Sequence, residues 1–431
     1  MPDGLRRLAD AVIGSGGRLN EAVPRDTRKR IAQCAARYGQ AGVSDGDLVL
    51  LAGLAPDDVL EAAVACWSVG AAVWVTPRKL NEVRVDHASF VVTAGLVVER
   101  CGKASGAHDD VAVVHETSGS TGQPKLARRS VDSVFAEHIG YREGLSLDTD
   151  DTVRVPVSVE HSFGFGVALS ALLSGCRVDV RPLTTPTIVA TDLDRGRATK
   201  VALSPALMRL LTRTVRRGAS RPRAVLVGAG PVSHALDSEC LARFGVAITR
   251  GYGSSETGGI FIGAKGIGRP IRSVEILLPE VGSRGELVVR TPFPVLGYMH
   301  EEVGQSSVWH TGDLVERDAS GQVSFVERKP GAVRANGRFV DVGPVQTALS
   351  AIKGVEDVTF AVVPRPGQSE FEDIYAVVVG RQVCPDTVEK TIRANTHVGF
   401  TPRVRIFEEL PRTGLGKLDR AALVEWIRRD G

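Results

Sequence analysis

The sequence lacks the features of a membrane, secreted or nucleic-acid-binding protein. No run in its 431 residues approaches the roughly 20 apolar residues that a membrane-spanning helix needs. The N-terminal stretch Met1–Asn20 has no long apolar core, which a secretory signal would require. The 53 basic and 50 acidic residues nearly cancel, so a net charge of +3 gives no reason to expect a nucleic acid or a membrane surface as partner.

Cysteine and histidine do not show the spacings of a disulfide framework or a metal site. The six cysteines include no CxxC pair, and the nine histidines include no HExxH pattern. Free thiols in a cytoplasmic protein are the simplest account, and no structural zinc is expected. The 43% hydrophobic and 24% charged residues are typical of a globular protein, and the length predicts two or three domains.

Short apolar runs alternate with helix-like stretches through the first three quarters of the chain. Asp47–Leu51 predicts a strand, Pro56–Ser68 a helix and Ala71–Val75 another strand. The alternation continues with strands expected at Val153–Val157, Arg177–Arg181, Lys200–Leu203, Ala224–Val227 and Val246–Thr249, and helices at Phe165–Leu173, Pro205–Arg216 and Ser233–Phe244. Strands and helices in this rhythm predict parallel βαβ units.

The pattern changes near Ala264. Short extended pieces at Glu275–Leu278, Gly285–Arg290 and Val323–Val326 predict a small β-rich subdomain. After the sequence RKPG at Arg328–Gly331, which fits a hinge or a plain surface turn, a separate α+β unit is expected. Its helices are predicted at Pro344–Ile352, Asp386–His397 and Asp419–Arg429, and its strands at Val355–Val363, Ile374–Val379 and Arg403–Phe407.

These patterns together predict an α/β fold with two domains. A large N-terminal domain of βαβ-type sheets, together with the small β-rich subdomain, would span residues 1–327. A small C-terminal α+β domain would span residues 328–431.

The segment His115–Lys125, HETSGSTGQPK, follows the apolar run Val111–Val114. Its glycines let backbone N–H groups point to one place, its hydroxyls add donors, and Lys125 adds a positive charge, which together suit a polyphosphate. The spacing is not the GxxxxGK[ST] of ordinary nucleoside triphosphatases. A Ser/Gly linker has a similar composition, but the strand-like run before the loop favours phosphate binding. The candidate residues are Thr117, Ser118, Gly119, Ser120, Thr121, Gly122 and Lys125.

Further segments carry Gly, Tyr, Asp, Glu or Lys in short loops, and each taken alone also fits a structural turn. They read VGAGPV at Val227–Val232, RGYGSSETGG at Arg250–Gly259, TGDL at Thr311–Leu314, VERKPG from Val326, RANGRFVDV at Arg334–Val342, PVSVEHSFGFG at Pro156–Gly166, and PRTGLGKLDR at Pro411–Arg420.

In the order in which they occur along the chain, these segments resemble those of the adenylate-forming superfamily, which includes acyl-CoA synthetases, aryl-acid ligases, nonribosomal-peptide adenylation domains and luciferases. The resemblance covers roughly residues 110–431. It implies a large adenylation core and a mobile C-terminal lid domain. It also implies ATP and Mg²⁺ as cofactors, and a small carboxylic acid as substrate.

The resemblance assigns roles at the nucleotide. Tyr252 would stack on adenine, between glycines Gly251 and Gly253 that allow close backbone approach. Ser255 would contact the α-phosphate, Glu256 would hold Mg²⁺, and Asp313 would accept hydrogen bonds from the ribose. The other wall of the adenine slot would be formed by Gly228, Ala229 and Gly230, with an apolar contact from Phe325, and Arg328 would also reach the ribose.

The resemblance also assigns the chemistry. Lys417 would be the catalytic residue, because its ammonium can meet both the acid's carboxylate and the α-phosphate as negative charge builds in the transition state. Arg328 and Lys329 would form the hinge, and Gly337 would lie beside the channel for a thiol. The acid pocket would include His161, Ser162 and Phe163, although His161 fits an interior histidine packed on apolar neighbours equally well.

Several positions depart from the family pattern, and one of them bears on the substrate. Ser162 stands where amino-acid-activating relatives carry an Asp, which argues against an α-amino acid, although Glu160 could substitute. Gly230, Asp341 and Leu415 replace the commoner Ala, Glu and Ser or Asn, and Leu126 stands where a Gly usually follows the Lys. The region before the phosphate loop is shorter than in most relatives.

The sequence therefore predicts an AMP-forming ligase that activates a non-amino, aryl or acyl carboxylic acid. The acyl group would pass to the thiol of CoA or of a carrier protein's phosphopantetheine. An amine acceptor, or a small inorganic oxyanion such as nitrite as the substrate, stays open. A non-catalytic nucleotide-binding relative and an unrelated ATPase also stay open, and an ATPase would release ADP rather than AMP.

Overall fold

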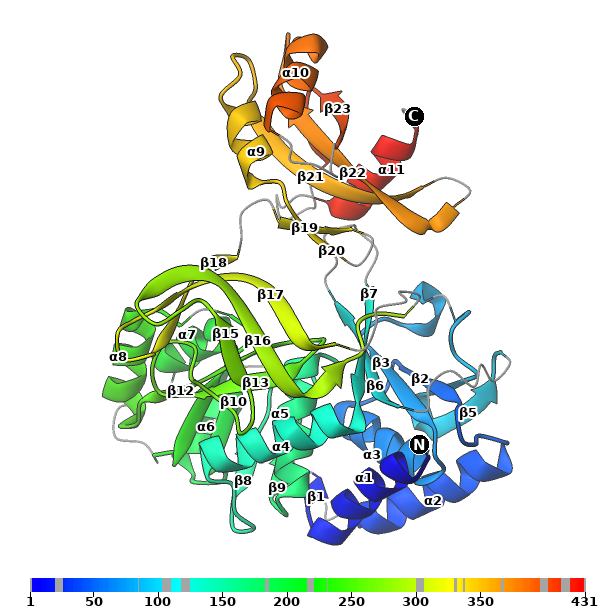
Figure 1. Ribbon diagram of the computed structural model, residues 1–431. Coiled ribbons are helices and arrows are strands. Elements are labelled where there is room, and N and C mark those ends of the chain that lie inside the picture. Colours follow the sequence, from blue (N-terminus) through cyan, green and yellow to red (C-terminus); the bar gives the residue numbers. More distant parts are fainter. Residues whose placement is uncertain are drawn as a thin grey trace.

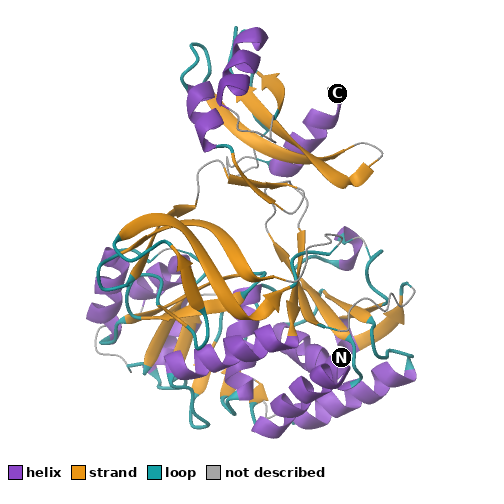
Figure 2. Ribbon diagram, in the orientation of Figure 1, coloured by secondary structure: helices purple, strands orange, loops and turns teal. Residues whose placement is uncertain are grey.

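The computed structural model describes residues 2–19, 26–83, 85–102, 110–117, 125–182, 186–214, 221–230, 232–299, 306–328, 332–335, 338–365, 368–395, 402–411 and 419–429. Two large sheets with helices packed on them make up most of the chain, and a smaller α+β unit lies beyond them at the C-terminal end (Figure 1; Figure 2). Within the described residues, no helix has the length and apolarity to cross a membrane.

The first sheet has the strand order β5-β4-β2-β3-β6-β7. The four strands from β4 to β6 are parallel, and β5 and β7 pair antiparallel at the two edges. Its strands are β2 (Leu48–Ala52), β3 (Ala72–Thr76), β4 (Phe90–Thr93), β5 (Val97–Arg100), β6 (Val111–Thr117) and β7 (Lys125–Ser130). The helices that precede β6 are α1 (Pro2–Ser15), α2 (Thr27–Gln40) and α3 (Pro56–Ser68), with short 3₁₀ turns at Leu80–Glu82 and Ala94–Leu96.

The second sheet has the order β1-β9-β8-β10-β11-β12-β13-β14, parallel from β1 to β12. Its strands are β1 (Arg18–Leu19), β8 (Thr152–Arg154), β9 (Arg177–Asp179), β10 (Lys200–Leu203), β11 (Ala224–Val227), β12 (Ile248–Ser254), β13 (Gly258–Gly263) and β14 (Arg269–Pro270). Its helices are α4 (Val131–Leu145), α5 (Ser162–Leu173), α6 (Pro186–Asp194), α7 (Pro205–Thr214) and α8 (His234–Phe244). These strands and crossover helices confirm the predicted βαβ units.

The largest apolar core draws on both sheets and on the helices α1 to α5. Trp67 of α3 and Phe165 of α5 are both fully buried and meet edge to face, with ring centroids 6.3 Å apart. Because this core fixes the two sheets relative to each other, it also fixes the loops at the carboxyl ends of their parallel strands, where ligands bind in open α/β sheets.

The remaining strands form smaller sheets. An antiparallel sheet contains β15 (Glu275–Leu278), β16 (Ser283–Val295), β17 (Ser306–Arg317) and β18 (Val323–Arg328), as predicted for the β-rich subdomain. Strands β19 (Ala332–Ala335) and β20 (Arg338–Asp341) follow as a pair. The C-terminal unit has β21 (Asp357–Arg365), β22 (Gln368–Val379), β23 (Arg403–Phe407), α9 (Gly343–Ser350), α10 (Pro385–Asn395) and α11 (Arg420–Arg429), with its own core. The predicted limits of 1–327 and 328–431 for the two domains stay a prediction.

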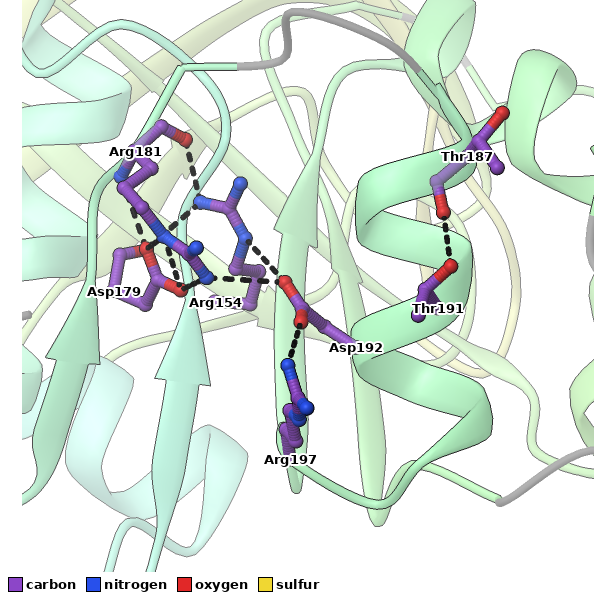
Figure 3. Close-up of polar contacts among 7 residues, drawn as sticks. All are labelled: Arg154, Asp179, Arg181, Thr187, Thr191, Asp192 and Arg197. Atoms are coloured by element: carbon purple, nitrogen blue, oxygen red, sulfur yellow. Dashed lines mark hydrogen bonds and ion pairs between the residues drawn. The ribbon is translucent and has the colours of Figure 1, made fainter. Parts of the chain in front are cut away.

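An ion-pair cluster around the buried Arg154 ties α6 to β8 and β9 of the second sheet (Figure 3). Arg154 Nη1 lies 3.2 Å from Asp179 Oδ1, and Arg154 Nε lies 3.8 Å from Asp192 Oδ2. Arg181 reaches both carboxylates, and Arg197 approaches Asp192 from its other side at 3.7 Å. Within α6 itself, the Thr191 hydroxyl donates to the Thr187 carbonyl. The cluster thus anchors the end of β8, from which the chain runs on to His161.

Several predicted elements coincide with the structure, and the others differ at their ends for local reasons. Helix Pro56–Ser68 and strands Lys200–Leu203, Ala224–Val227 and Arg403–Phe407 have the predicted limits. The helix expected at Phe165–Leu173 begins three residues earlier, at Ser162. The strand expected at Val246–Thr249 lies at Ile248–Ser254 instead, because the glycines of RGYGS continue to pair with β13.

Candidate functional site

The predicted phosphate loop connects two paired strands. Thr117 at the end of β6 lies directly opposite Lys125 at the start of β7 in the antiparallel register. The residues between them, which include the predicted Ser118, Gly119, Ser120, Thr121 and Gly122, lie outside the described part of the chain. Both ends of the loop therefore meet at the edge where the parallel strands β2, β3 and β6 terminate, as phosphate binding requires.

Glu116 fixes the start of this loop. Its carboxylate accepts hydrogen bonds from Arg78 Nη2 at 2.7 Å, from Arg78 Nε at 2.9 Å and from the Thr76 hydroxyl at 2.8 Å. The pair is bidentate, a geometry that adds orientation as well as attraction. Thr76 is the last residue of β3, and Arg78 follows shortly after it. Their hydrogen bonds to Glu116 therefore fix the position of Thr117, the next residue in the chain.

Lys125 and Glu256 lie on either side of Tyr298. The ammonium of Lys125 is 5.3 Å from the centroid of the Tyr298 ring, and the Tyr298 hydroxyl donates a short hydrogen bond to Glu256 Oε1. Glu256 and Tyr298 are both buried. Lys125 Nζ is also 3.5 Å from Glu372 Oε1 of the C-terminal unit. The predicted phosphate cation and the predicted metal carboxylate are thus brought together by an aromatic residue that the sequence motifs did not identify.

Glu256 is suited to a magnesium ion that is held mainly by its substrate. Among the described residues, no group of three or more His, Cys, Asp or Glu could form a protein-only metal site. Mg²⁺ commonly takes one or two carboxylates and completes its octahedron with phosphate oxygens and water. A single buried carboxylate, oriented by the Tyr298 hydroxyl, fits that donor set.

The predicted adenine walls come from adjacent strands. Gly228, Ala229 and Gly230 follow β11, and Tyr252 lies on β12, which is parallel to β11 with Val227 opposite Arg250. Ala229 has φ of +57°, in the left-handed region that favours glycine, so its backbone is strained. Ala229 and Tyr252 line one cavity of about 200 Å³.

Tyr252 and Asp313 are joined directly. The Tyr252 hydroxyl donates to Asp313 Oδ2 at 2.7 Å. Asp313 on β17 lies opposite Arg328 on β18 in the antiparallel register, so the two predicted ribose contacts are neighbours across one hairpin. Phe325 is 37% exposed and does not line the cavity, so its adenine contact stays a prediction.

The three predicted acid-pocket residues meet at the start of α5. His161 immediately precedes α5, Ser162 and Phe163 open the helix, and all three line the same cavity as Tyr252. His161 is exposed, so it is not a packed interior histidine. The packed interior histidine is instead His115, which is fully buried and whose ring centroid lies 5.2 Å from that of Phe165. Burial lowers the pKa of His115 to about 3.

The cavity is completed by residues that the sequence motifs did not identify. Glu137 and Tyr141 of α4 line it, and their four-residue spacing, which places both on one face of the helix, is the one signal that could have identified them. A second cavity, of about 240 Å³, is lined by residues that include Arg30, Cys34 and Arg37 and contains none of the predicted site residues.

Some predictions fall outside what the structure describes. Lys417, Lys329 and Gly337 lie beyond the described residues, and for Arg328 only the backbone is described. Their roles as catalytic lysine, hinge and thiol channel stay predictions.

Comparison with known proteins shows what the chain is similar to. Residues 99–299 match the family of AMP-binding enzymes. The chain is 27% identical to feruloyl-CoA synthase from Amycolatopsis sp, over 95% of this chain and 94% of that protein. It is 26% identical to 2-succinylbenzoate--CoA ligase from Enterococcus faecalis, over 72% of this chain and 68% of that protein.

The fold agrees with this assignment. The structure of ATP-bound MatB from Rhodopseudomonas palustris superposes with a TM-score of 0.64 over 99% of both chains, at 19% identity. An identity this low establishes a common fold only. The sequence match confirms the resemblance: residues 99–299 contain an AMP-binding domain, and the chain is similar over most of its length to a CoA-ester-forming synthase. Among individual proteins, it is similar to the CoA ligases named above.

Proposed function

We propose that this protein uses ATP and Mg²⁺ to activate a non-amino carboxylic acid as an acyl-adenylate, with release of pyrophosphate, and then transfers the acyl group to the thiol of CoA. The observation that carries the proposal is a convergence of residues. Tyr252, His161 and Phe163 line one cavity, and Asp313 contacts Tyr252.

The geometry supports a reaction that depends on positioning and charge. The acid is already ionised at pH 7, so its carboxylate needs no base before it attacks the α-phosphate. Tyr252 and Ala229 would hold the adenine, and Asp313 the ribose. Lys125 would bind the leaving phosphates, because its ammonium lies at the end of the phosphate loop. When bound at Glu256, Mg²⁺ would neutralise phosphate charge.

The C-terminal unit supplies the remaining part of the proposal. Lys417 would enter the site for the first half-reaction, and rotation at Arg328 and Lys329 would then bring Gly337 toward the thiol. The contact of Lys125 with Glu372 supports this, because the C-terminal unit reaches the edge of the phosphate loop there. CoA is favoured as acceptor over a carrier protein by the similarity to CoA ligases. The six unpaired cysteines support a cytoplasmic location.

The test is product analysis with a panel of aryl, fatty and short acids. The protein is incubated with ATP, Mg²⁺ and each acid, with and without CoA or a phosphopantetheinylated carrier. AMP and pyrophosphate should appear with the correct acid, and a thioester should appear with CoA. ADP as the nucleotide product, or no acid-dependent AMP with any acid, would contradict the proposal. An amide formed with an added amine would change the acceptor and leave the first step intact.

A further inference from the structure

Two polar side chains of α4 contribute to the lining of the 200 Å³ cavity. Glu137 and Tyr141 are one helical turn apart, and each is only 3% exposed. The other helix residues that line the cavity, Ser162 and Phe163, come from the start of α5. The cavity wall therefore contains buried polar side chains. A pocket for an acid with a plain hydrocarbon body would be expected to have apolar side chains there.

Glu137 forms an ion pair inside the protein. Arg129 Nη1, on a side chain with no exposed surface, donates to Glu137 Oε2 at 2.8 Å, and the Gly259 backbone N–H donates to Oε1 at 2.7 Å. A carboxylate oxygen can accept two hydrogen bonds. Arg129 thus compensates the charge of the Glu137 carboxylate. The carboxylate oxygens can accept further hydrogen bonds in addition to the two that the described residues donate.

Tyr141 adds a hydroxyl beside that carboxylate. Its oxygen lies 2.6 Å from where a Cβ on Gly259 would stand and 3.7 Å from where a Cβ on Gly251 would stand, so it rests against glycine backbone. Burial raises the pKa of Tyr141 well above its ordinary value, and the nearby Glu137 charge acts in the same direction. The phenol therefore stays protonated and can both donate and accept a hydrogen bond.

The space beside these groups is narrow. Glycines Gly251, Gly253, Gly258 and Gly259 contribute backbone without side chains, and the ring of Phe163 comes within 2.4 Å of where a Cβ on Gly228 would stand. The volume of about 200 Å³ is below the roughly 300–1,000 Å³ of pockets for drug-sized ligands. Because Tyr252 and Ala229, the proposed adenine contacts, line the same cavity, the part left for the acid beside Glu137 and Tyr141 suits at most one flat ring.

Resting on the acid-activating function proposed above, we propose that this site selects a planar monocarboxylic acid with a hydroxyl or amino group on the end remote from its carboxylate. Glu137 accepts the hydrogen bond from that group, and Tyr141 makes a second one. A carboxylate in the same place would meet the buried negative charge of Glu137 and lose its own hydration. The site therefore rejects dicarboxylic acids, unlike a ligase for 2-succinylbenzoate.

The unaltered protein provides the first test. Acid-dependent pyrophosphate release is measured with benzoates that carry 4-hydroxy, 4-amino, 4-methyl or 4-carboxy groups, and with the matching cinnamates. We expect kcat/KM at least about tenfold higher for 4-hydroxy or 4-amino than for 4-methyl, as a hydrogen bond to a charged group gives. The 4-carboxy acids should be at least about tenfold worse than 4-methyl. Equal rates for 4-hydroxy and 4-methyl acids, or efficient use of 4-carboxy acids, would overturn the inference.

Variants then assign the effect to the two residues. Tyr141→Phe should reduce the 4-hydroxy to 4-methyl ratio about threefold or more. The double variant Arg129→Met/Glu137→Gln removes both buried charges together, so no unpaired guanidinium is left, and should relieve the penalty on 4-carboxy acids about tenfold. Glu143→Gln, on the exposed end of the same helix, is the matched control and should change neither ratio. Unchanged ratios in both pocket variants would overturn the assignment.

The outcomes separate this inference from the proposed function. If no acid supports pyrophosphate release, the acid-activating function itself fails. If acids are activated and the remote group makes no difference, only the role of Glu137 and Tyr141 fails.

Discussion

The Tyr252 hydroxyl donates a hydrogen bond to Asp313 Oδ2 at 2.7 Å, which links β12 of the second large sheet to β17 of the β-rich sheet. The residue proposed to stack on adenine therefore orients the residue proposed to bind ribose. The two residues lie on strands of different sheets, and this hydrogen bond holds their side chains next to each other.

Substitutions at this pair should have different effects on ATP binding. Asp313→Ala should weaken ATP binding by at least about tenfold, since it removes a charged hydrogen-bond acceptor. Tyr252→Phe keeps the ring, so ATP affinity should change by about threefold or less, while unfolding free energy falls by about 1 kcal/mol. Calorimetric titration with ATP and denaturant unfolding measure the two effects. Asp318→Asn, in the turn after β17, is the control, and wild-type affinity in Asp313→Ala would refute the ribose role.

The contact between Lys125 and Glu372 predicts a competition for the phosphate-loop lysine. The two charges lie 3.5 Å apart, and each side chain is only 16% exposed. Glu372→Gln removes an anion that competes with the triphosphate, so the KM for ATP should fall about two- to fivefold, as expected for a modest ion pair. Steady-state kinetics in ATP measure this. Glu389→Gln, an exposed carboxylate of the same unit, should have no effect, and an equal change in both variants would rule out a specific contact.

Lys417→Ala should separate the two half-reactions. If the ammonium of Lys417 stabilises the α-phosphate during adenylation only, the variant should lose acid-dependent pyrophosphate exchange and retain thioester formation from supplied acyl-adenylate. Isotope exchange and mass spectrometry follow the two steps. Lys353→Ala, an exposed lysine of the same unit, serves as the control. Equal loss of both activities would contradict the division of roles.

His115 predicts a loss of stability in acid. Burial lowers its pKa from about 6.5 to about 3, so the folded state favours the neutral imidazole. Below pH 6.5 the unfolded chain takes up a proton that the folded chain does not, so this contribution to stability is present above pH 6.5 and is lost as the pH falls toward 3. Between pH 7 and pH 5 the loss is about 2 kcal/mol.

The variant His115→Leu isolates that contribution. Both ring nitrogens of His115 are buried and have no hydrogen-bond partner among the described residues, so an apolar replacement leaves no orphaned group. Denaturant unfolding at several pH values should show that the drop between pH 7 and pH 5 is smaller in the variant by about 2 kcal/mol. His234→Leu removes an exposed imidazole and should leave the pH profile as in the wild type. Parallel profiles for His115→Leu and the wild type would show that the imidazole is not held neutral.

The sequence could predict those parts of the site that local motifs specify. The fifteen-residue separation of Asp313 and Arg328 is a joint signal for a ribose site, and the β17–β18 register places the two residues opposite each other. The motifs predict that His161, Ser162 and Phe163 form one pocket, and all three line the cavity that Tyr252 also lines. In both cases the residues come from continuous segments whose shape is decided by short-range hydrogen bonding.

The parts that the sequence did not predict depend on long-range packing. Tyr298 lies 42 residues from Glu256 and Glu372 lies 247 residues from Lys125, and no periodicity relates them. The spacing of Glu137 and Tyr141 shows that they share a helix face, but what that face meets is decided by how α4 packs on β13. Side-chain contacts between separate elements are set by tertiary structure, which a single sequence does not display.

The cluster in Figure 3 predicts a large effect on stability from residues that do not line the cavity. Asp192 is 4% exposed and pairs with Arg181 at 3.1 Å, beside the buried Arg154. Asp192→Ala leaves buried positive charge without one of its carboxylates, so unfolding free energy should fall by about 3–5 kcal/mol. Asp194→Ala, an exposed carboxylate two residues further on in α6, should cost well under 1 kcal/mol. Guanidinium unfolding of the two variants gives the comparison. Equal stability of both would mean that Arg154 is compensated by Asp179 alone, and the fold would then not need Asp192 to hold α6 against β8.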